Sequence, residues 1–130
     1  LDCPPSLGVL TVAALTAADG VLIPLQCETL SHRGVGQLLD TVRDVKRILN
    51  KKLKVIGILP TLFDGRSNHA REVLDDVGER YGIPVLSPPI PKTVRFAEAP
   101  AVGRSILSTS RTSKGAKAYR EVAASLLAAT

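Results

Sequence analysis

Two short apolar runs alternate along this chain with stretches that have helical spacing. The runs cover residues 20–26 and 54–61, and continuous runs of this length are typical of parallel strands that are covered on both faces. Elsewhere, apolar residues recur every three or four positions, as on one side of a helix. These stripes comprise Val35, Leu38, Leu39, Val42, Val45 and Leu49, and then Ala70, Val73, Leu74 and Val77. The pattern predicts an α/β fold with a parallel, doubly wound sheet and right-handed crossovers.

Residues that cap helices stand where the apolar pattern changes. Ser6 is placed to cap a helix over residues 9–15, and Ser67 or Asn68 to cap the helix that carries the second stripe. Gly82 follows that second helix, in the position of a C-terminal glycine. We therefore expect these helices to begin and end near these residues.

The last third of the chain is richer in proline and less regular. Residues 83–91 have the composition of a strand, but their prolines predict an edge position or an irregular exit toward a site. An extended segment should then lead into a short helix that Pro100 stops. Beyond it we expect a short strand over residues 103–107, a turn over 111–115 and a terminal helix with one apolar face over 116–127.

Length and composition limit the architecture further. The 130 residues leave room for one α/β domain, 1–130, and its core should be aliphatic because aromatic residues make up 3% of the chain. Cys3 and Cys27 both fall at predicted strand ends, and we expect reduced thiols there. No apolar run approaches the roughly 20 residues of a membrane span.

Positive charge is concentrated in the second part of the chain, and the net charge is +5. Residues 1–50 hold four Lys or Arg against five Asp or Glu, whereas residues 51–130 hold thirteen against seven. A basic half of this kind suits contact with a polyanion such as nucleic acid. A solvated surface that carries the same charge is an equal alternative.

The start of the chain carries the first candidate for chemistry. Pro4 and Pro5 follow Asp2 closely, and because proline cannot donate to a β-ladder, a strand that reaches Asp2 must end there. In open α/β sheets, ligands bind outside the carboxyl ends of the strands. This position favours a ligand-binding carboxylate at Asp2, although a lone strand-end aspartate is structural about as often.

Three longer motifs resemble one family. Residues 2–8 read DCPPSLG, residues 17–28 read AADGVLIPLQCE and residues 90–100 read IPKTVRFAEAP. Together they closely resemble the ParA/Soj family of chromosome and plasmid partitioning ATPases, which are deviant Walker-type P-loop NTPases with a Rossmann-like sheet. The third motif is similar to the family pattern IPRNVRLSEAP and departs from it at Lys92 and Thr93, among others.

The phosphate-binding loop of that family is not found in this sequence. No G-x-x-x-x-G-K-[ST] pattern occurs, and Gly34-Val35-Gly36-Gln37 contains no lysine. The resemblance therefore implies the C-terminal portion of a ParA-like ATPase domain, without its P-loop. Phosphoryl transfer depends on that loop and on Mg²⁺ for positioning and electrostatic stabilisation, so we expect no ATP hydrolysis by these residues alone.

The resemblance also implies roles for single residues. Asp2 would close the Walker B strand and help to hold Mg²⁺, with ATP as the nucleotide. Thr61, Pro91 and Thr93 would line the adenine side, Pro91 through its backbone. The family further implies a homodimer formed with ATP, a ParB-like partner protein that stimulates hydrolysis, and a cytoplasmic, nucleoid-associated location.

Two arginines match residues that bind DNA without sequence preference in Soj-like proteins. These are Arg66 and Arg95, and each follows a predicted strand end on the ligand side, so we expect both on one rim of the sheet. The local alternative is an ion pair, with Asp64 for Arg66 and with Glu98 for Arg95.

Two other functions fit parts of the sequence. A positioning ATPase of the MinD type would contact a membrane through a basic amphipathic C-terminal helix, but residues 126–130 read LLAAT and carry no basic side chain. A non-catalytic piece that binds a partner without nucleotide is compatible with the missing phosphate loop. We therefore expect no membrane contact and favour the partitioning function.

Overall fold

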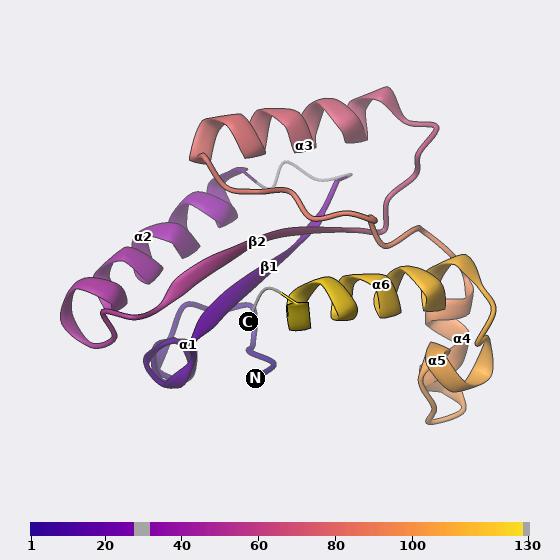
Figure 1. The fold of residues 1–130 in the computed structure, drawn as a ribbon, viewed down its shortest axis with the longest axis horizontal. Helices are drawn as coiled ribbons and strands as arrows, with labels where there is room; N and C mark the ends of the chain where they lie inside the picture. The colour runs from indigo at the N-terminus through magenta and orange to yellow at the C-terminus, as the bar shows by residue number, and fades with distance from the viewer. Residues whose placement is uncertain (28–31, 129–130) are drawn as a thin grey trace.

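The computed structural model describes residues 1–27 and 32–128. Within these ranges it contains two strands and six helices (Figure 1). In chain order they are α1 (Val9–Ala17), β1 (Gly20–Gln26), α2 (His32–Ile48), β2 (Lys54–Thr61), α3 (Asn68–Tyr81), α4 (Arg95–Ala101), α5 (Ile106–Thr109) and α6 (Lys114–Ala128). The alternation of helix and strand as far as α3 confirms the predicted α/β pattern.

The two strands form a parallel pair. The register places Gly20 beside Lys54 at one end and Gln26 beside Thr61 at the other, with one irregularity near the start. Because α2 lies in the connection between them, β1, α2 and β2 form a βαβ unit. The predicted parallel pairing of these two segments is therefore confirmed.

The second edge of β2 is occupied by an irregular segment, residues 84–92. Ile58 donates its backbone N–H to the carbonyl of Pro84 (2.9 Å), and the N–H of Leu86 donates to the carbonyl of Ile58 (2.8 Å). Further along, the N–H of Ile90 donates to a β2 carbonyl at 2.8 Å. β2 is therefore paired on both edges.

For residues 83–91 we predicted either an edge strand or an irregular exit, and the regular strand is not formed. They make isolated parallel bridges to the chain around β2, at Val85 and at Pro91. Four of these nine residues are prolines, and because a proline donates no N–H, a continuous ladder is not possible here. The predicted irregular exit, by contrast, is confirmed.

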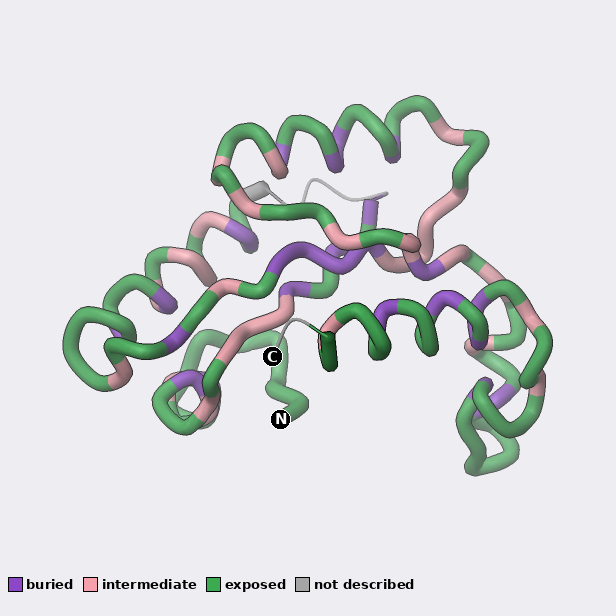
Figure 2. Tube along the Cα trace, viewed as in Figure 1, coloured by how far each residue is buried: buried purple, intermediate pink, exposed green. Residues whose placement is uncertain are grey.

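Helices cover both faces of the sheet, as Figure 1 shows. α3 and the start of α2 pack on the face that presents Ile58. Leu59 points to the opposite face, because side chains alternate along a strand, and it packs there against α6. α1 packs against α2 through Leu15. Figure 2 shows buried positions concentrated along β2 and on the inner sides of the helices. Helices therefore cover both faces of the sheet, as in a doubly wound fold.

Two of the three predicted helix caps are confirmed. Ser67 accepts a backbone N–H from the first turn of α3 at 3.2 Å, and Gly82 ends that helix with a φ of +61°. Ser6 does not cap α1, which begins at Val9 after Gly8. The carbonyl of Ser6 instead accepts a hydrogen bond from the Thr11 hydroxyl at 2.7 Å. The side chain that stabilises this turn therefore belongs to α1 itself and not to a residue that precedes it.

Two predicted strands are absent from the described residues. Residues 1–4 form no strand with any described segment, so the strand predicted to end at Asp2 is not seen among the described residues. Residues 103–107 are not a strand either: Ile106 begins α5 and is buried against α4 and α6. A single helical turn buries this side chain without the partner strand that a β-ladder would need.

Pro100 does not stop α4, which continues to Ala101. The chain leaves the helix at Gly103, whose φ is +64°, a conformation that glycine adopts at little cost. The predicted end of this helix was therefore close to the observed one, but Pro100 is not the residue that ends it.

We expect Gly57→Ala to destabilise the fold. The φ of Gly57 is +157°, and a Cβ on it would lie 2.7 Å from the Pro84 carbonyl oxygen, which accepts the Ile58 N–H. Backbone strain and overpacking together predict a loss of about 1–3 kcal/mol in the free energy of unfolding. Urea unfolding of the purified protein measures it.

The matched control is Gly34→Ala in α2, because a Cβ there has no atom within 4 Å. Replacement of a helical glycine by alanine should leave stability unchanged or raise it by about 0.5–1 kcal/mol. Equal unfolding midpoints for the Gly57→Ala variant and the unmodified protein would contradict the pairing of β2 with residues 84–86.

Candidate functional site

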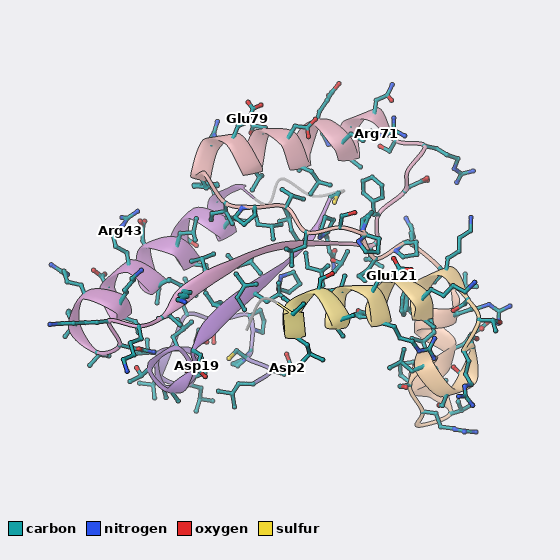
Figure 3. All side chains as sticks on the ribbon, viewed as in Figure 1. Asp2, Asp19, Arg43, Arg71, Glu79 and Glu121 are labelled. Carbon is teal, nitrogen blue, oxygen red and sulfur yellow. The ribbon has the colours of Figure 1, made fainter. Side chains whose placement is uncertain are left out.

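Asp2 lies in an exposed, irregular segment beside the outer edge of β1. Residues 1–5 and β1 line one groove of about 1010 Å³, together with parts of α1 and α2. Asp2 is the one carboxylate among the described residues that line it, and the rest of the lining is mostly apolar. The Asp2 side chain, labelled in Figure 3, makes no hydrogen bond or ion pair with another described residue. It is therefore available to a ligand.

The groove offers one carboxylate for a metal ion, but no cationic side chain for the phosphates of a nucleotide. Mg²⁺ is usually bound through one or two carboxylates, waters and substrate phosphates, and Asp2 suits one of these places. A triphosphate, however, needs cationic side chains or a cradle of backbone N–H groups, and no Lys or Arg lines the groove. Among the described residues, no group of three His, Cys, Asp or Glu side chains is placed to hold a metal ion.

Thr61, Pro91 and Thr93 lie at a different place, where β2 meets residues 84–92. Phe63 exchanges two backbone hydrogen bonds, each of 3.0 Å, with the residues on either side of Pro91. Thr61 ends β2 two residues earlier. The structure thus brings Thr61 and Pro91 to the same edge of the sheet, but none of the three residues lines the groove that contains Asp2.

Two local features shape this edge. Leu62, directly after Thr61, has a φ of +49°, a conformation that costs energy in a non-glycine residue and is concentrated at functional sites. Thr93 precedes α4, and its hydroxyl oxygen accepts the backbone N–H of Arg95 at 3.4 Å. This hydrogen bond holds the Thr93 side chain beside the first residue of the helix.

Arg66 is engaged by Asp64, as the local alternative predicted. Its Nε donates to Asp64 Oδ1 at 3.1 Å and its Nη2 to Oδ2 at 3.2 Å, although the Arg66 side chain is 92% exposed. Side-chain and backbone hydrogen bonds from Arg66 lower the pKa of the Asp64 carboxyl, and the same side-chain bond raises the pKa of Arg66. A phosphate would therefore compete with Asp64 for the Arg66 guanidinium.

Arg95 is placed differently. It begins α4, it is exposed, and its Nη1 donates to the Ser110 hydroxyl oxygen at 3.1 Å. No ion pair joins it to Glu98 or to another carboxylate within the described residues, so the alternative pairing with Glu98 is wrong. Among the described residues, no carboxylate compensates the charge of Arg95.

The loop around Ser110 was missed as part of a site. Residues 108–113 read STSRTS, and this run of hydroxyls around Arg111 was a signal. We predicted a strand and a turn in this region, and those assignments gave no reason to place the loop beside Arg95. The contact depends on how α4, α5 and α6 pack, which the local sequence pattern does not specify.

Comparison with known proteins shows which sequences this chain is similar to. Residues 1–55 match the family described as AAA domain. The chain is 44% identical, over 95% of its length, to the sporulation initiation inhibitor protein Soj of Bacillus subtilis. It is 46% identical, over 92% of its length, to the chromosome partitioning protein ParA of Myxococcus xanthus. It covers 49% and 42% of those proteins, and so spans about half the length of the curated relatives it matches.

Solved structures support the fold. One from Mycobacterium smegmatis, described as cobyrinic acid a,c-diamide synthase with bound ADP and magnesium, is 56% identical with a TM-score of 0.80, over 97% of this chain and 44% of that one. The cell division ATPase MinD of Pyrococcus furiosus is 24% identical with a TM-score of 0.71, over 99% and 51%, and is alike in fold alone. The predicted Rossmann-like α/β fold class is confirmed.

We expect the pKa of Asp64 to rise in Arg66→Ala, toward the ordinary value of about 3.9. The reason is that the variant loses the Arg66 side-chain hydrogen bond, the largest of the interactions that lower this pKa, while the backbone N–H of residue 66 still donates to Asp64. Because the folded-state pKa is lowered, this carboxyl stabilises the fold above its unfolded pKa, and the contribution is lost as pH falls through the folded value. Titration of the carboxyl ¹³C resonance measures the shift.

Arg71→Ala is the control for this titration, since Arg71 donates to the Gly65 carbonyl in the same loop and not to Asp64. The Asp64 pKa should stay lowered in that variant. If the Arg66→Ala and Arg71→Ala variants titrate alike, the pair with Arg66 is not what sets this pKa.

Proposed function

We propose that this chain, which is homologous to the ParA/Soj partitioning ATPases over about half of their length, forms part of an ATP-dependent protein for DNA segregation. The observation that carries the proposal is the match itself. Two proteins named for sporulation control and chromosome partitioning, from different bacteria, each align with more than nine-tenths of the chain. The position of Arg95 supports it.

Within such a protein this chain would supply parts of the nucleotide site. Asp2 would contribute a carboxylate to Mg²⁺, and Thr61, Pro91 and Thr93 would contact the adenine. The separation of these two places on the sheet supports such a division, because a nucleotide extends from its base to its phosphates. The triphosphate would need other groups, since no cationic side chain lines the groove beside Asp2.

The DNA contact would be made by basic side chains that follow β2 and its partner segment. Arg95 is the stronger candidate because none of the carboxylates that the structure describes pairs with it, whereas Arg66 already has two hydrogen bonds to Asp64. An ATP-bound homodimer, a ParB-like partner that stimulates hydrolysis, and a cytoplasmic protein that associates with the nucleoid complete the proposal. They rest on the resemblance of residues 2–8, 17–28 and 90–100 to the ParA/Soj family.

A second candidate function comes from the structure of Mycobacterium smegmatis. Its identity of 56% is higher than the 44% to Soj, and its description names a cobyrinic acid a,c-diamide synthase. This chain would then contribute to the nucleotide part of such a synthase. The two functions differ in what they require of Arg95, because only the partitioning function needs a contact with DNA.

A membrane-positioning function has less support. The likeness to MinD is one of fold alone, and α6 has no basic residue in its last turn, whereas helices that bind membrane surfaces are rich in Lys and Arg. None of the helices within residues 1–27 and 32–128 is both long and apolar enough to cross a bilayer.

We expect Arg95→Ala in the full-length protein to weaken binding to duplex DNA of any sequence alike. A phosphate contact contributes affinity and carries no base identity. Loss of one contact should lower the magnitude of the slope of log K against log salt by about 0.9. Arg66→Ala should have a smaller effect, because its guanidinium is shared with Asp64. Fluorescence anisotropy with ATP present, at several salt concentrations, measures both.

Arg43→Ala serves as the control for charge, since Arg43 pairs with Asp40 on α2, and α2 lies across the molecule from α4, the helix that begins with Arg95 (Figure 1). Its salt slope should be unchanged. A protein that binds no DNA in any of these forms would favour the synthase, and an unchanged slope in Arg95→Ala would remove this arginine from the interface.

A further inference from the structure

A second cavity, of about 430 Å³, lies between the start of α4 and the loop after α5. Each residue that lines it carries a guanidinium or a hydroxyl group. The lining consists of Arg95, Arg111 and the five Ser and Thr residues between 108 and 113. A cavity that presents hydrogen-bond donors and positive charge, with no carboxylate in its lining, is suited to an oxyanion.

Neither of the two lining arginines is paired with a carboxylate of the described ranges, 1–27 and 32–128. Arg95 and Arg111 form no ion pair in the part of the chain that the structure describes, whereas Arg43 and Arg66 each pair with a carboxylate. Residues 92–120 hold seven Lys or Arg side chains and one carboxylate. The local potential is therefore positive, and it attracts an anion.

The walls of the cavity are held in place by hydrogen bonds. Arg120 on α6 donates to the carbonyl of Arg111 at 2.7 Å and to that of Leu107 at 3.3 Å, which ties down the loop from outside. Arg95 is held from inside, because its Nη1 donates to the Ser110 hydroxyl oxygen at 3.1 Å. Groups that are already ordered lose less entropy when a ligand binds.

The helix that carries Arg95 is also fixed against α6. The ring of Phe96 packs edge-on against Tyr119, with centroids 5.8 Å apart and planes at 86°. Gly115 leaves the room that this ring occupies, since a Cβ on it would lie 2.7 Å from Phe96 Cζ. The backbone of Arg95 is therefore held in place beside the cavity by the packing of the next residue, Phe96, against α6.

Some of the hydroxyls are used locally. Those of Ser108 and Thr109 both donate to the carbonyl of Ser105, at 3.0 and 3.2 Å. The Ser113 hydroxyl oxygen accepts a backbone N–H at the start of α6. The donors that remain for a ligand are the two guanidinium groups and the hydroxyls of Ser110 and Thr112.

We propose that this cavity binds a phosphate group between Arg95 and Arg111, with the Ser110 and Thr112 hydroxyls as further donors. The planar fork of arginine suits phosphate because it donates two parallel hydrogen bonds. The expected source is a phosphodiester of DNA, and in that respect the inference rests on the proposed function. Free phosphate is the other source of the same chemistry.

The test uses the full-length protein and two matched variants. Arg111→Gln removes a lining arginine, whereas Arg104→Gln removes an exposed arginine of the same segment that does not line the cavity. Both change the net charge equally. Amide resonances of residues 108–113 are followed by ¹⁵N NMR while inorganic phosphate or a short DNA duplex is added, and the salt dependence of DNA binding is measured in parallel.

We expect phosphate and DNA each to shift these resonances. Arg111→Gln should weaken phosphate binding about tenfold, as loss of a hydrogen bond to a charged group implies, and should lower the DNA salt slope by about 0.9. Arg104→Gln should change neither, and Arg111→Lys, which keeps the charge without the fork, should be intermediate. Equal losses in Arg111→Gln and Arg104→Gln would show general electrostatics and overturn the proposal.

The two sources of phosphate give different outcomes. If phosphate shifts the loop while DNA binds without shifting it, the cavity is a site for free phosphate and the DNA function stands. Phosphate binding by a protein that binds no DNA would support the cavity and refute the proposed function. Resonances that respond to neither addition would refute the cavity alone, provided that Arg95→Ala still weakens DNA binding.

Discussion

The pairing of β2 along both of its edges is the interaction on which the rest of this structure depends. β1 pairs in parallel with one edge, and residues 84–92 form hydrogen bonds along the other. The second pairing requires a glycine at position 57, because any Cβ there would meet the Pro84 carbonyl. With β2 held in the centre, its alternating side chains present Ile58 to α3 and Leu59 to α6, and this forms the two layers of helices.

The same strand sets the positions of the candidate functional groups. Thr61 leaves β2 at the edge where the chain returns with Pro91, and α4 begins soon afterwards with Arg95. A nucleotide base and a DNA phosphate would therefore be contacted by segments that are rigidly connected through β2. Asp2 stands apart on the far side of β1, in a groove without cationic side chains. Under the proposed function, the described residues would supply parts of a nucleotide site and not its phosphate cradle.

Local patterns predicted what local forces determine. The apolar runs and stripes gave the strands and long helices correctly, and the cap at Ser67 and the glycine at position 82 are confirmed because each depends on its own turn. The short strand over 103–107 was wrong, since burial of Ile106 by α4 and α6 decides its conformation. The pair of Arg66 with Asp64 was foreseen as an alternative, but the neighbours of Arg95 depend on helix packing, which no pattern along the chain reveals.

Native-state amide hydrogen exchange tests the central role of β2 most directly. The account predicts that the N–H groups of Ile58, Leu86 and Ile90, which donate between β2 and residues 84–92, exchange slowly and together, at rates set by global unfolding. If the amides of Leu86 and Ile90 exchanged as fast as those of an unstructured chain while Ile23 in β1 remained protected, β2 would be paired on one edge alone. That result would contradict the account.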